Sequence, residues 1–268
     1  MNLSATDDPN GSGIREIDYV LSGAQSEPQQ AVVGDTVTRT ISTEGETALK
    51  FFAVDNFGNP ELPHRVTVRI DKTPPSIAAS QDPPSNGNGG NSGDVTVSFM
   101  CADGLSGLVA CDAPVTITSE GSGQSVTGTA ADVAGNMAQV SVSGINIDRT
   151  APSVTCSVTP SVLWPPKHKL IPIAATVNVT DALSGANGFV LTSVTSSEPD
   201  SVNRKDKPGN IQGFVVASPS TTGQLRAERI VKGPGRVYSL TWTGQDAAGN
   251  AASCSATVTV PKKKPKNH

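Results

Sequence analysis

Short stretches in which apolar and polar residues alternate run through most of the chain. Ile14–Gly23, Thr47–Asp55 and Ala138–Ile147 are clear examples, and clusters of Gly, Pro, Asp and Asn separate such stretches. Alternation with a period of two predicts half-buried β-strands, because successive side chains of a strand point to opposite faces. No stretch shows the 3.6-residue period of a convincing amphipathic helix. The pattern therefore predicts an all-β protein.

One arrangement, a tight turn followed by an alternating strand and then proline, occurs three times. Its copies are Ala53–Pro75, Asp132–Pro152 and Gln245–Pro261. Three copies of one domain ending predict three domains of one kind, and short strands of this type stack into β-sandwiches. Proline cannot continue a strand ladder, so the joints are expected to be short, stiff hinges that make the chain a rod. The predicted boundaries are 1–73, 74–150 and 151–262, with a basic tail at 263–268.

The first domain differs from the other two at its beginning. Met1–Gly13 aligns with Val95–Gly107 and with Val177–Gly185, each of them a strand that runs into an Asp-x-x-Ser-Gly turn, which is stretched in the first copy. The later copies have another strand ahead of this point, within PPSIAAS and APSVTCSV. We therefore expect the first domain to lack its first strand. Unpaired backbone at such an edge can recruit another chain, and head-to-tail filaments would follow if a neighbouring molecule supplied the strand.

The third domain is the longest and contains both tryptophans. Gln224–Ile230 and Arg236–Gly244 are expected to pair across the intervening residues as a hairpin. Trp242 lies in the middle of the second of these strands and is expected in the core. Trp164 precedes two prolines, so it either covers the sandwich edge or presents its ring to a sugar.

Composition and charge restrict the classes of partner. The chain has 268 residues, a net charge of -4, only 4% aromatic residues and 16% charged residues. This balance gives no overall attraction to nucleic acid or to an anionic membrane. No apolar run approaches the roughly 18 residues of a membrane span, and the first residues do not resemble a signal peptide.

An Asp-x-x-Gly-Asn motif stands between two strands in each domain. The simplest interpretation is a tight turn, in which the Asp accepts backbone N–H groups and the Gly adopts a positive φ. The alternative is a calcium site, because the Asp-x-x-Ser-Gly turn could lie at the same end of the sandwich and offer a second carboxylate. Asp103 would then approach Asp132, and Asp181 would approach Asp246. The candidate calcium ligands are Asp8, Asp55, Asp103, Asp132, Asp181 and Asp246.

The four cysteines belong to the second and third domains, two in each. Their positions on predicted strands predict the disulfides Cys101–Cys111 and Cys156–Cys254. The second would close nearly a whole domain and stabilise it by roughly 4–5 kcal/mol on chain-entropy grounds. Zinc is the competing interpretation, but no Cys-x-x-Cys occurs. Disulfides indicate an oxidising compartment.

The residues available for catalysis do not form a recognisable group. The histidines His64, His168 and His268 stand in three different contexts. Glu198 and Asp200 could pair for glycoside hydrolysis, but their Ser, Pro and Lys neighbours indicate side chains that face solvent or coordinate an ion. We assign no catalytic residue, and the chain is not expected to be an enzyme.

Several motifs taken together resemble bacterial tandem immunoglobulin-like repeats. They are Asp-x-x-Ser-Gly, Asp-x-x-Gly-Asn, Ile-Asp-Lys/Arg-Thr-x-Pro and Ser/Thr-x-Glu-Gly at Ser42–Gly45. The third domain, with LWPPKHKL, looks like the hyalin-repeat branch of that group. One departure lies in the loop after Glu198, where relatives often place more Asp and Gly. The charged residues of this loop are Arg204, Lys205, Asp206 and Lys207, and its added positive charge would weaken a cation site there.

The resemblance implies three immunoglobulin-like β-sandwich domains in a secreted or cell-surface protein of bacteria. The expected function is structural, as a spacer, adhesive module or assembly unit, with a protein, a glycan or a second copy as partner. No cofactor is required, calcium being the one candidate, and neither nucleic acid nor membrane insertion is expected. The alternative is a carbohydrate-binding accessory region of a secreted enzyme, acting through Trp164 and the Ser196–Gly213 loop.

Overall fold

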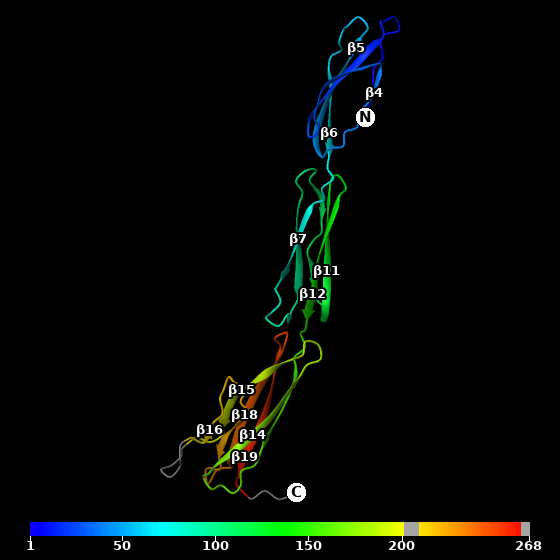
Figure 1. The fold of residues 1–268 in the computed structure, drawn as a ribbon. Coiled ribbons are helices and arrows are strands. Elements are labelled where there is room, and N and C mark those ends of the chain that lie inside the picture. The colour runs from blue at the N-terminus through cyan, green and yellow to red at the C-terminus, as the bar shows by residue number, and fades with distance from the viewer. Residues whose placement is uncertain (201–208, 264–268) are drawn as a thin grey trace. The chain divides into compact units, whose positions relative to one another are not determined.

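The computed structural model describes residues 1–200 and 209–263, and these residues form strands, turns and loops (Figure 1). Within these described ranges, six antiparallel sheets stack as three tandem β-sandwiches, which confirms the predicted fold class. In the part of the chain that the structure describes, no helix has the length and apolar character needed to cross a lipid bilayer.

The first sandwich has one very small sheet. Its strands are β1 (Asn2–Ser4), β2 (Ile14–Gly23), β3 (Glu27–Val33), β4 (Thr36–Thr38), β5 (Gly45–Asp55) and β6 (His64–Ile70). Among the described residues β1 pairs with β4 alone, and the facing sheet has the order β3-β2-β5-β6. The alternating apolar residues meet between the two sheets. The buried members of this core are Leu3, Ile17, Tyr19, Leu21 and Leu49.

The second sandwich is built from two three-stranded sheets, ordered β10-β8-β7 and β12-β11-β9. Its strands are β7 (Ser76–Asp82), β8 (Val95–Ala102), β9 (Leu108–Cys111), β10 (Val115–Ile117), β11 (Gly121–Asp132) and β12 (Met137–Ile147). A ring from β8 packs directly over a glycine of β11. A Cβ atom on Gly128 would lie 2.3 Å from Phe99, so only glycine fits beneath this ring.

The third sandwich has the largest core and pairs a four-stranded sheet, β13-β14-β17-β16, with a three-stranded sheet, β15-β18-β19. Its strands are β13 (Ser153–Thr159), β14 (Leu170–Thr180), β15 (Ala186–Ser196), β16 (Ile211–Gln212), β17 (Thr222–Arg226), β18 (Gly235–Asp246) and β19 (Ala251–Pro261). Trp242 and Tyr238 are fully buried between the sheets, as predicted for Trp242.

One predicted pairing in the third sandwich is wrong. The stretches Gln224–Ile230 and Arg236–Gly244 do not form a hairpin, because β17 pairs with β14 and β16 whereas β18 pairs with β15 and β19. The connection between them therefore crosses from one sheet to the other. Both stretches alternate, and alternation alone does not say which sheet a strand joins.

The chain divides into two compact units, and the division passes through the second sandwich. The first sandwich belongs wholly to one unit, and the third belongs wholly to the other. The ranges are Met1–Ser80, Ser98–Pro114 and Thr127–Ser141 in the first unit, and Gln81–Val97, Val115–Val126 and Val142–His268 in the second. The predicted boundaries after residues 73 and 150 therefore stay predictions.

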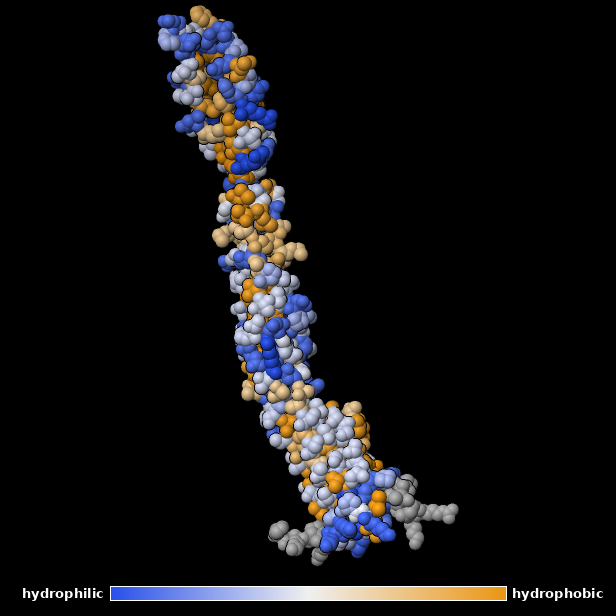
Figure 2. Space-filling model, turned by 180° about the vertical axis from the view of Figure 1, so that it is seen from behind, coloured by the Kyte–Doolittle hydropathy of each residue, from blue (hydrophilic) through white to orange (hydrophobic). Residues whose placement is uncertain are grey.

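Apolar side chains also occur on the surface, where Figure 2 shows them on the visible face among polar ones. Exposed examples are Phe57, Leu62, Met100, Val133 and Met137. Apolar atoms make up a large share of any protein surface, so these residues do not identify a binding site by themselves.

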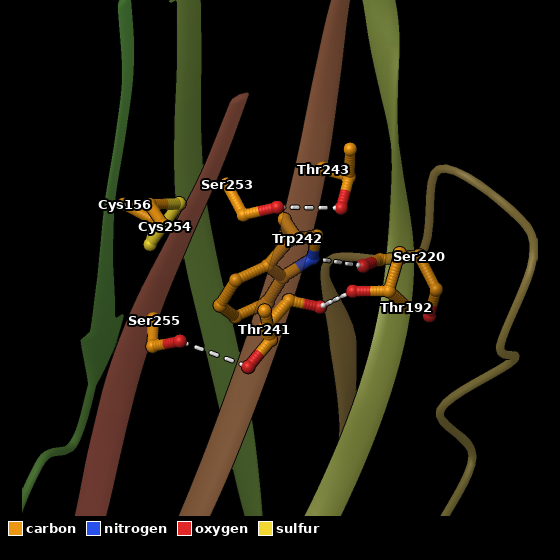
Figure 3. The surroundings of a disulfide bond; sticks show 9 residues. All are labelled: Cys156, Thr192, Ser220, Thr241, Trp242, Thr243, Ser253, Cys254 and Ser255. Atoms are coloured by element: carbon orange, nitrogen blue, oxygen red, sulfur yellow. Dashed lines mark hydrogen bonds between the residues drawn. A yellow bond between two sulfur atoms is a disulfide. The ribbon is translucent and has the colours of Figure 1, made fainter. Parts of the chain in front are cut away.

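The four cysteines form the disulfides Cys101–Cys111 and Cys156–Cys254, the same pairs that the sequence predicts. The second disulfide joins β13 of one sheet to β19 of the other. Figure 3 shows it beside the buried ring of Trp242, whose Nε1 donates a hydrogen bond to the carbonyl of Ser220 at 2.9 Å. The disulfide links the two sheets, and the indole fills the core beside it.

Candidate metal sites at the acidic turns

Each Asp-x-x-Gly-Asn motif is a turn that its own Asp and Asn hold closed. Asp132 accepts a hydrogen bond from the backbone N–H of Asn136 and another from its Nδ2, both at 2.8 Å. Gly135 has a φ of 93°, which glycine adopts without strain. The same two bonds, at the same length, join Asp246 to Asn250 and Asp55 to Asn59. The turn interpretation of this motif therefore describes all three copies.

The Asp-x-x-Ser-Gly turns are held in a second way, by an Asp that accepts the N–H of the closing glycine. The pairs and distances are Asp103 to Gly107 at 2.7 Å, Asp181 to Gly185 at 2.9 Å and Asp7 to Gly13 at 2.7 Å. In the first sandwich this role therefore belongs to Asp7 rather than to the predicted ligand Asp8. The backbone carbonyl of Asp8 instead accepts the N–H of Gly11 at 2.7 Å.

A third Asp joins the two turns from the connection that follows a strand. Asp71 directly follows β6, and its carboxylate accepts the N–H of Ser106 at 2.9 Å. Its carbonyl accepts a hydrogen bond from Nδ2 of Asn136 at 3.2 Å. The connection is thus bonded to both acidic turns of the second sandwich.

The same arrangement recurs one sandwich further along the chain. Asp148 directly follows β12, and its carboxylate accepts the N–H of Ser184 at 3.0 Å. Its carbonyl accepts a hydrogen bond from Nδ2 of Asn250 at 2.8 Å. Two connections with different neighbours therefore use the same set of polar contacts.

These contacts bring three carboxylates together twice. The groups are Asp71, Asp103 and Asp132, and Asp148, Asp181 and Asp246. Within each group, one oxygen from every residue lies within 4.8 Å of the others. Asp132, Asp148 and Asp246 are at most 2% exposed. Among the described residues, none of the six forms an ion pair with Lys or Arg.

Hydrogen bonds lower the pKa of one carboxylate in each group, Asp71 in the first and Asp181 in the second. The side chain and backbone of Ser106, together with the N–H of Thr73, hold the pKa of Asp71 below its usual value. Burial acts to raise the pKa of Asp181, but the N–H groups of its turn outweigh burial and lower it. Carboxylate oxygens are the ligand atoms that hard cations such as Ca²⁺ prefer, and each group brings three such side chains together.

Comparison with known proteins gives similarity to solved structures only. No family model matches the chain, and no curated protein matches it. A structure of a bacterial ice-binding adhesin aligns with 93% of this chain and 87% of its own, at 14% identity and a TM-score of 0.41. Domains EC3-6 of protocadherin gammaB7 align with 94% and 69%, at 15% identity and a TM-score of 0.37. A tetra-tandem repeat of a large adhesion protein aligns with 97% and 70%, at 15% identity and a TM-score of 0.29.

Four of the six predicted calcium ligands lie in these two groups, in the predicted pairs Asp103 with Asp132 and Asp181 with Asp246. The remaining two do not, since Asp55 and Asp8 belong to no group of three in the described part of the chain. The sequence reasoning missed Asp71 and Asp148. Both residues belong to the repeated Ile-Asp-Lys/Arg-Thr-x-Pro motif, in which the Asp directly follows a strand.

Of the two roles expected for Glu198, facing solvent or coordinating an ion, the first is wrong. The side chain is 6% exposed, and its Oε2 lies 3.4 Å from Nε of the buried Arg236. The same oxygen accepts the N–H of Ile230 at 2.7 Å. A carboxylate in this position holds the end of the third sandwich together, and the charge of Arg236 is what permits its burial.

The other residues that were considered for a site are dispersed. Hydrogen bonds from the N–H groups of Gly209 and Asn210 lower the pKa of Asp200, which is therefore a charged anchor of its loop. His168 places Nδ1 at 2.9 Å from the buried Glu228. Trp164 is 37% exposed. The charged loop residues Arg204, Lys205, Asp206 and Lys207, the end of the basic tail and His268 lie outside the described residues.

Proposed function

We propose that the chain is a non-catalytic, extracellular module of tandem β-sandwiches that serves as a spacer or adhesive element at a bacterial surface. In this proposal Ca²⁺ binds at the two acidic groups and holds each connection against the sandwich that follows it. One observation carries the proposal: an Asp from a connection meets the two turn Asp residues of the next sandwich in both places. A module that must transmit force or maintain spacing requires stiffness at such connections.

Electrostatics favours a cation at each acidic group. Three carboxylates within 4.8 Å of one another repel, and at an effective dielectric constant of 20 two unit charges 4 Å apart interact by about 4 kcal/mol. The hydrogen bonds that these carboxylates accept reduce this repulsion, and a bound cation would offset it further. Ca²⁺ takes about six to eight oxygen ligands in flexible geometry, and these carboxylates, turn carbonyls and water can supply them.

Cysteine chemistry supports the extracellular location. The chain has four cysteines, and all of them are in disulfides. Structural disulfides persist in secreted and cell-surface proteins and are rare in the reducing cytosol. The bacterial origin and the hyalin-repeat type of the third sandwich rest on the resemblance of the sequence motifs.

The structural roles of the residues considered for catalysis support a non-catalytic module. Glu198 pairs with Arg236 inside the third sandwich, and its possible partner Asp200 accepts the N–H groups of its own loop. A glycosidase acid and nucleophile must instead face a substrate across a cleft. The contacts of both carboxylates therefore hold parts of the third sandwich in place.

Thermal unfolding of the whole chain in calcium and in chelator tests the proposal. We expect stabilisation in calcium, by about 2.7 kcal/mol for each site at a free concentration 100 times the Kd. Calorimetric titration should give two sites, and Asp132→Asn or Asp246→Asn should each remove one of them.

Asp55→Asn is the matched control, because Asp55 makes the same turn bonds without belonging to a group of three. It should destabilise its own turn and leave both calcium sites. Equal unfolding curves in calcium and chelator would refute the proposal, and so would loss of calcium binding in Asp55→Asn.

A further inference from the structure

A glutamate stands directly before one long strand in each of the first two sandwiches. Glu44 precedes β5 and Glu120 precedes β11, and a glycine follows each of them. The Ser/Thr-x-Glu-Gly motif therefore occurs twice, at residues 42–45 and 118–121. Neither the acidic turns nor the disulfides involve this motif, so its glutamate requires an explanation of its own.

The first glutamate binds the connection that follows its own sandwich. The backbone N–H of Lys72 donates to Oε1 of Glu44 at 2.8 Å, and the hydroxyl of Thr73 donates to the same oxygen at 2.7 Å. Both donors come directly after Asp71, the residue that this connection contributes to the first acidic group. The N–H of Lys72 and then the hydroxyl of Thr73 hold the pKa of Glu44 below its usual value. The carboxylate thus fixes the chain just beyond Asp71.

The second glutamate makes the same contacts with the next connection. The backbone N–H of Arg149 donates to Oε1 of Glu120 at 2.6 Å, and the hydroxyl of Thr150 donates to that oxygen at 3.1 Å. These donors directly follow Asp148, the connection residue of the second acidic group. One set of bonds therefore recurs at two connections that differ in their neighbouring residues.

The threonine that donates its hydroxyl to the glutamate donates its N–H to the connection Asp. The N–H of Thr73 lies 3.0 Å from Oδ1 of Asp71, and that of Thr150 lies 3.0 Å from Oδ1 of Asp148. The other oxygen of each Asp, Oδ2, accepts the serine N–H of the acidic turn that follows. Glutamate, threonine and Asp thus form a chain of hydrogen bonds that ends at an acidic group.

The third sandwich lacks both the glutamate and the connection Asp. Pro234 directly precedes β18, in the place where a glutamate precedes β5 and β11. Lys262 follows the Asp-x-x-Gly-Asn turn at the spacing that Asp71 and Asp148 have from their own turns. Among the three sandwiches, the glutamate therefore occurs where a connection Asp occurs, as expected if the first serves the second.

The two glutamates lie outside the acidic groups themselves. Neither Glu44 nor Glu120 belongs to a group of three candidate ligands in the part of the chain that the structure describes. Within the same residues, neither forms an ion pair with Lys or Arg. In both cases Oε1 accepts an N–H and a hydroxyl of the connection. Each glutamate therefore acts on its acidic group through the connection.

We infer that Glu44 and Glu120 are positioning residues for the two acidic groups. Each glutamate fixes the Lys/Arg-Thr pair of its connection, and the threonine then orients the Asp carboxylate toward the other two. The inference rests on the proposed calcium function and adds a contribution from the sandwich that precedes each connection. A ligand held in place before binding increases affinity, because less conformational freedom is lost when the cation binds.

Calcium titration of a chain that retains one acidic group tests the inference. Asp132→Asn leaves the second group intact, and the Glu120 variants are compared in that chain. Glu120→Ala should weaken calcium binding by about tenfold, since it removes the acceptor of two hydrogen bonds. Glu120→Gln keeps an acceptor oxygen for both donors and should stay within about threefold. A glutamate that contacted the cation directly would lose as much affinity with Gln as with Ala.

Matched variants show whether the effect follows the chain of hydrogen bonds. In the Asp132→Asn chain, Glu44→Ala should leave calcium binding unchanged, because Glu44 contacts the other connection. Thr150→Val should weaken binding alone but add nothing to Glu120→Ala, since both break the same chain of bonds. In chelator, the N–H of Arg149 should exchange with solvent faster in Glu120→Ala than in the chain that retains Glu120. If Glu120→Ala does not fold, Thr150→Val tests the same bonds with the carboxylate in place.

Three outcomes would overturn the inference. Unchanged affinity in Glu120→Ala would refute the positioning role and leave the proposed function standing. Equal losses with Ala and Gln would make the glutamate a direct ligand. Absence of calcium binding by the unaltered chain would refute both proposals together.

Discussion

Removal of the disulfide between β13 and β19 is the sharpest test of how the third sandwich is stabilised. The perturbation is the double substitution Cys156→Ala and Cys254→Ala. This disulfide closes a loop with a sequence separation of 98 and lies beside the buried Trp242 (Figure 3). A cross-link of this kind stabilises mainly by restricting the unfolded chain, and the restriction grows with the length of the loop.

The chain-entropy relation gives the expected magnitude. A loop of about 100 residues corresponds to about 4.7 kcal/mol, whereas a loop of about ten residues corresponds to about 2.8 kcal/mol. The first value applies to Cys156–Cys254 and the second to Cys101–Cys111, whose separation is 10. For a domain of about 110 residues, a loss of 4.7 kcal/mol lowers the unfolding midpoint by about 20 °C.

Tryptophan fluorescence reports the third sandwich selectively, because the only two tryptophans of the chain, Trp164 and Trp242, both belong to it. Denaturant unfolding followed by tryptophan fluorescence should show that the free energy of unfolding falls by about 4.7 kcal/mol. Cys101→Ala with Cys111→Ala is the control, and it should leave the tryptophan transition in place while lowering the stability of the second sandwich. An unchanged tryptophan transition in the first variant, or an equal shift in both, would contradict the reasoning.

Three further predictions concern packing, a buried charge and pH. Gly128→Ala should destabilise the second sandwich by about 1–3 kcal/mol in calorimetry, because its Cβ would lie 2.3 Å from the ring of Phe99; a rise in stability would contradict this packing. Glu198→Ala should lower the free energy of unfolding of the third sandwich by about 3–5 kcal/mol, measured by tryptophan fluorescence, because the charge of Arg236 stays buried without this carboxylate. A change below about 1 kcal/mol would exclude a stabilising role for the pair. The pKa of Asp181 is lower in the folded state than its ordinary value of 3.8, so its contribution to stability is fully present above pH 3.8 and is lost as the pH falls through the folded pKa. In acid titrations followed by tryptophan fluorescence, Asp181→Asn should therefore reduce the loss of stability below pH 3.8.

Much of the fold could be predicted from the sequence because its information is local. Period-two alternation marks half-buried strands, and the buried Trp242 follows from its place within one of them. The cysteine pairs could also be predicted, since each cysteine lies on or at the end of such a strand. The Asp-x-x-Gly-Asn turns form as expected because their hydrogen bonds join residues only four positions apart.

The features that sequence reasoning missed depend on contacts between distant residues. β17 and β18 alternate like a hairpin but belong to different sheets, and only the partners β14 and β15 decide this. Asp148 meets Asp246 across nearly a hundred residues, so its proline-flanked motif alone could not place it. Glu198 has polar neighbours in sequence and is buried because Arg236, far along the chain, pairs with it.

The three sandwiches fill one core position in three ways, although their strands follow the same order of turns. In the third, Trp242 occupies the position and β13 covers it through the disulfide. In the second, Gly128 stands four residues before Asp132, and the ring of Phe99 fills the space above it. In the first, Phe51 occupies the position but faces a cavity. There its ring stacks on His64, the residue of β6 with which it pairs. The shared turns and strand order therefore leave the packing of this position to the individual side chains around it, and a local change there can be accommodated without a change of fold.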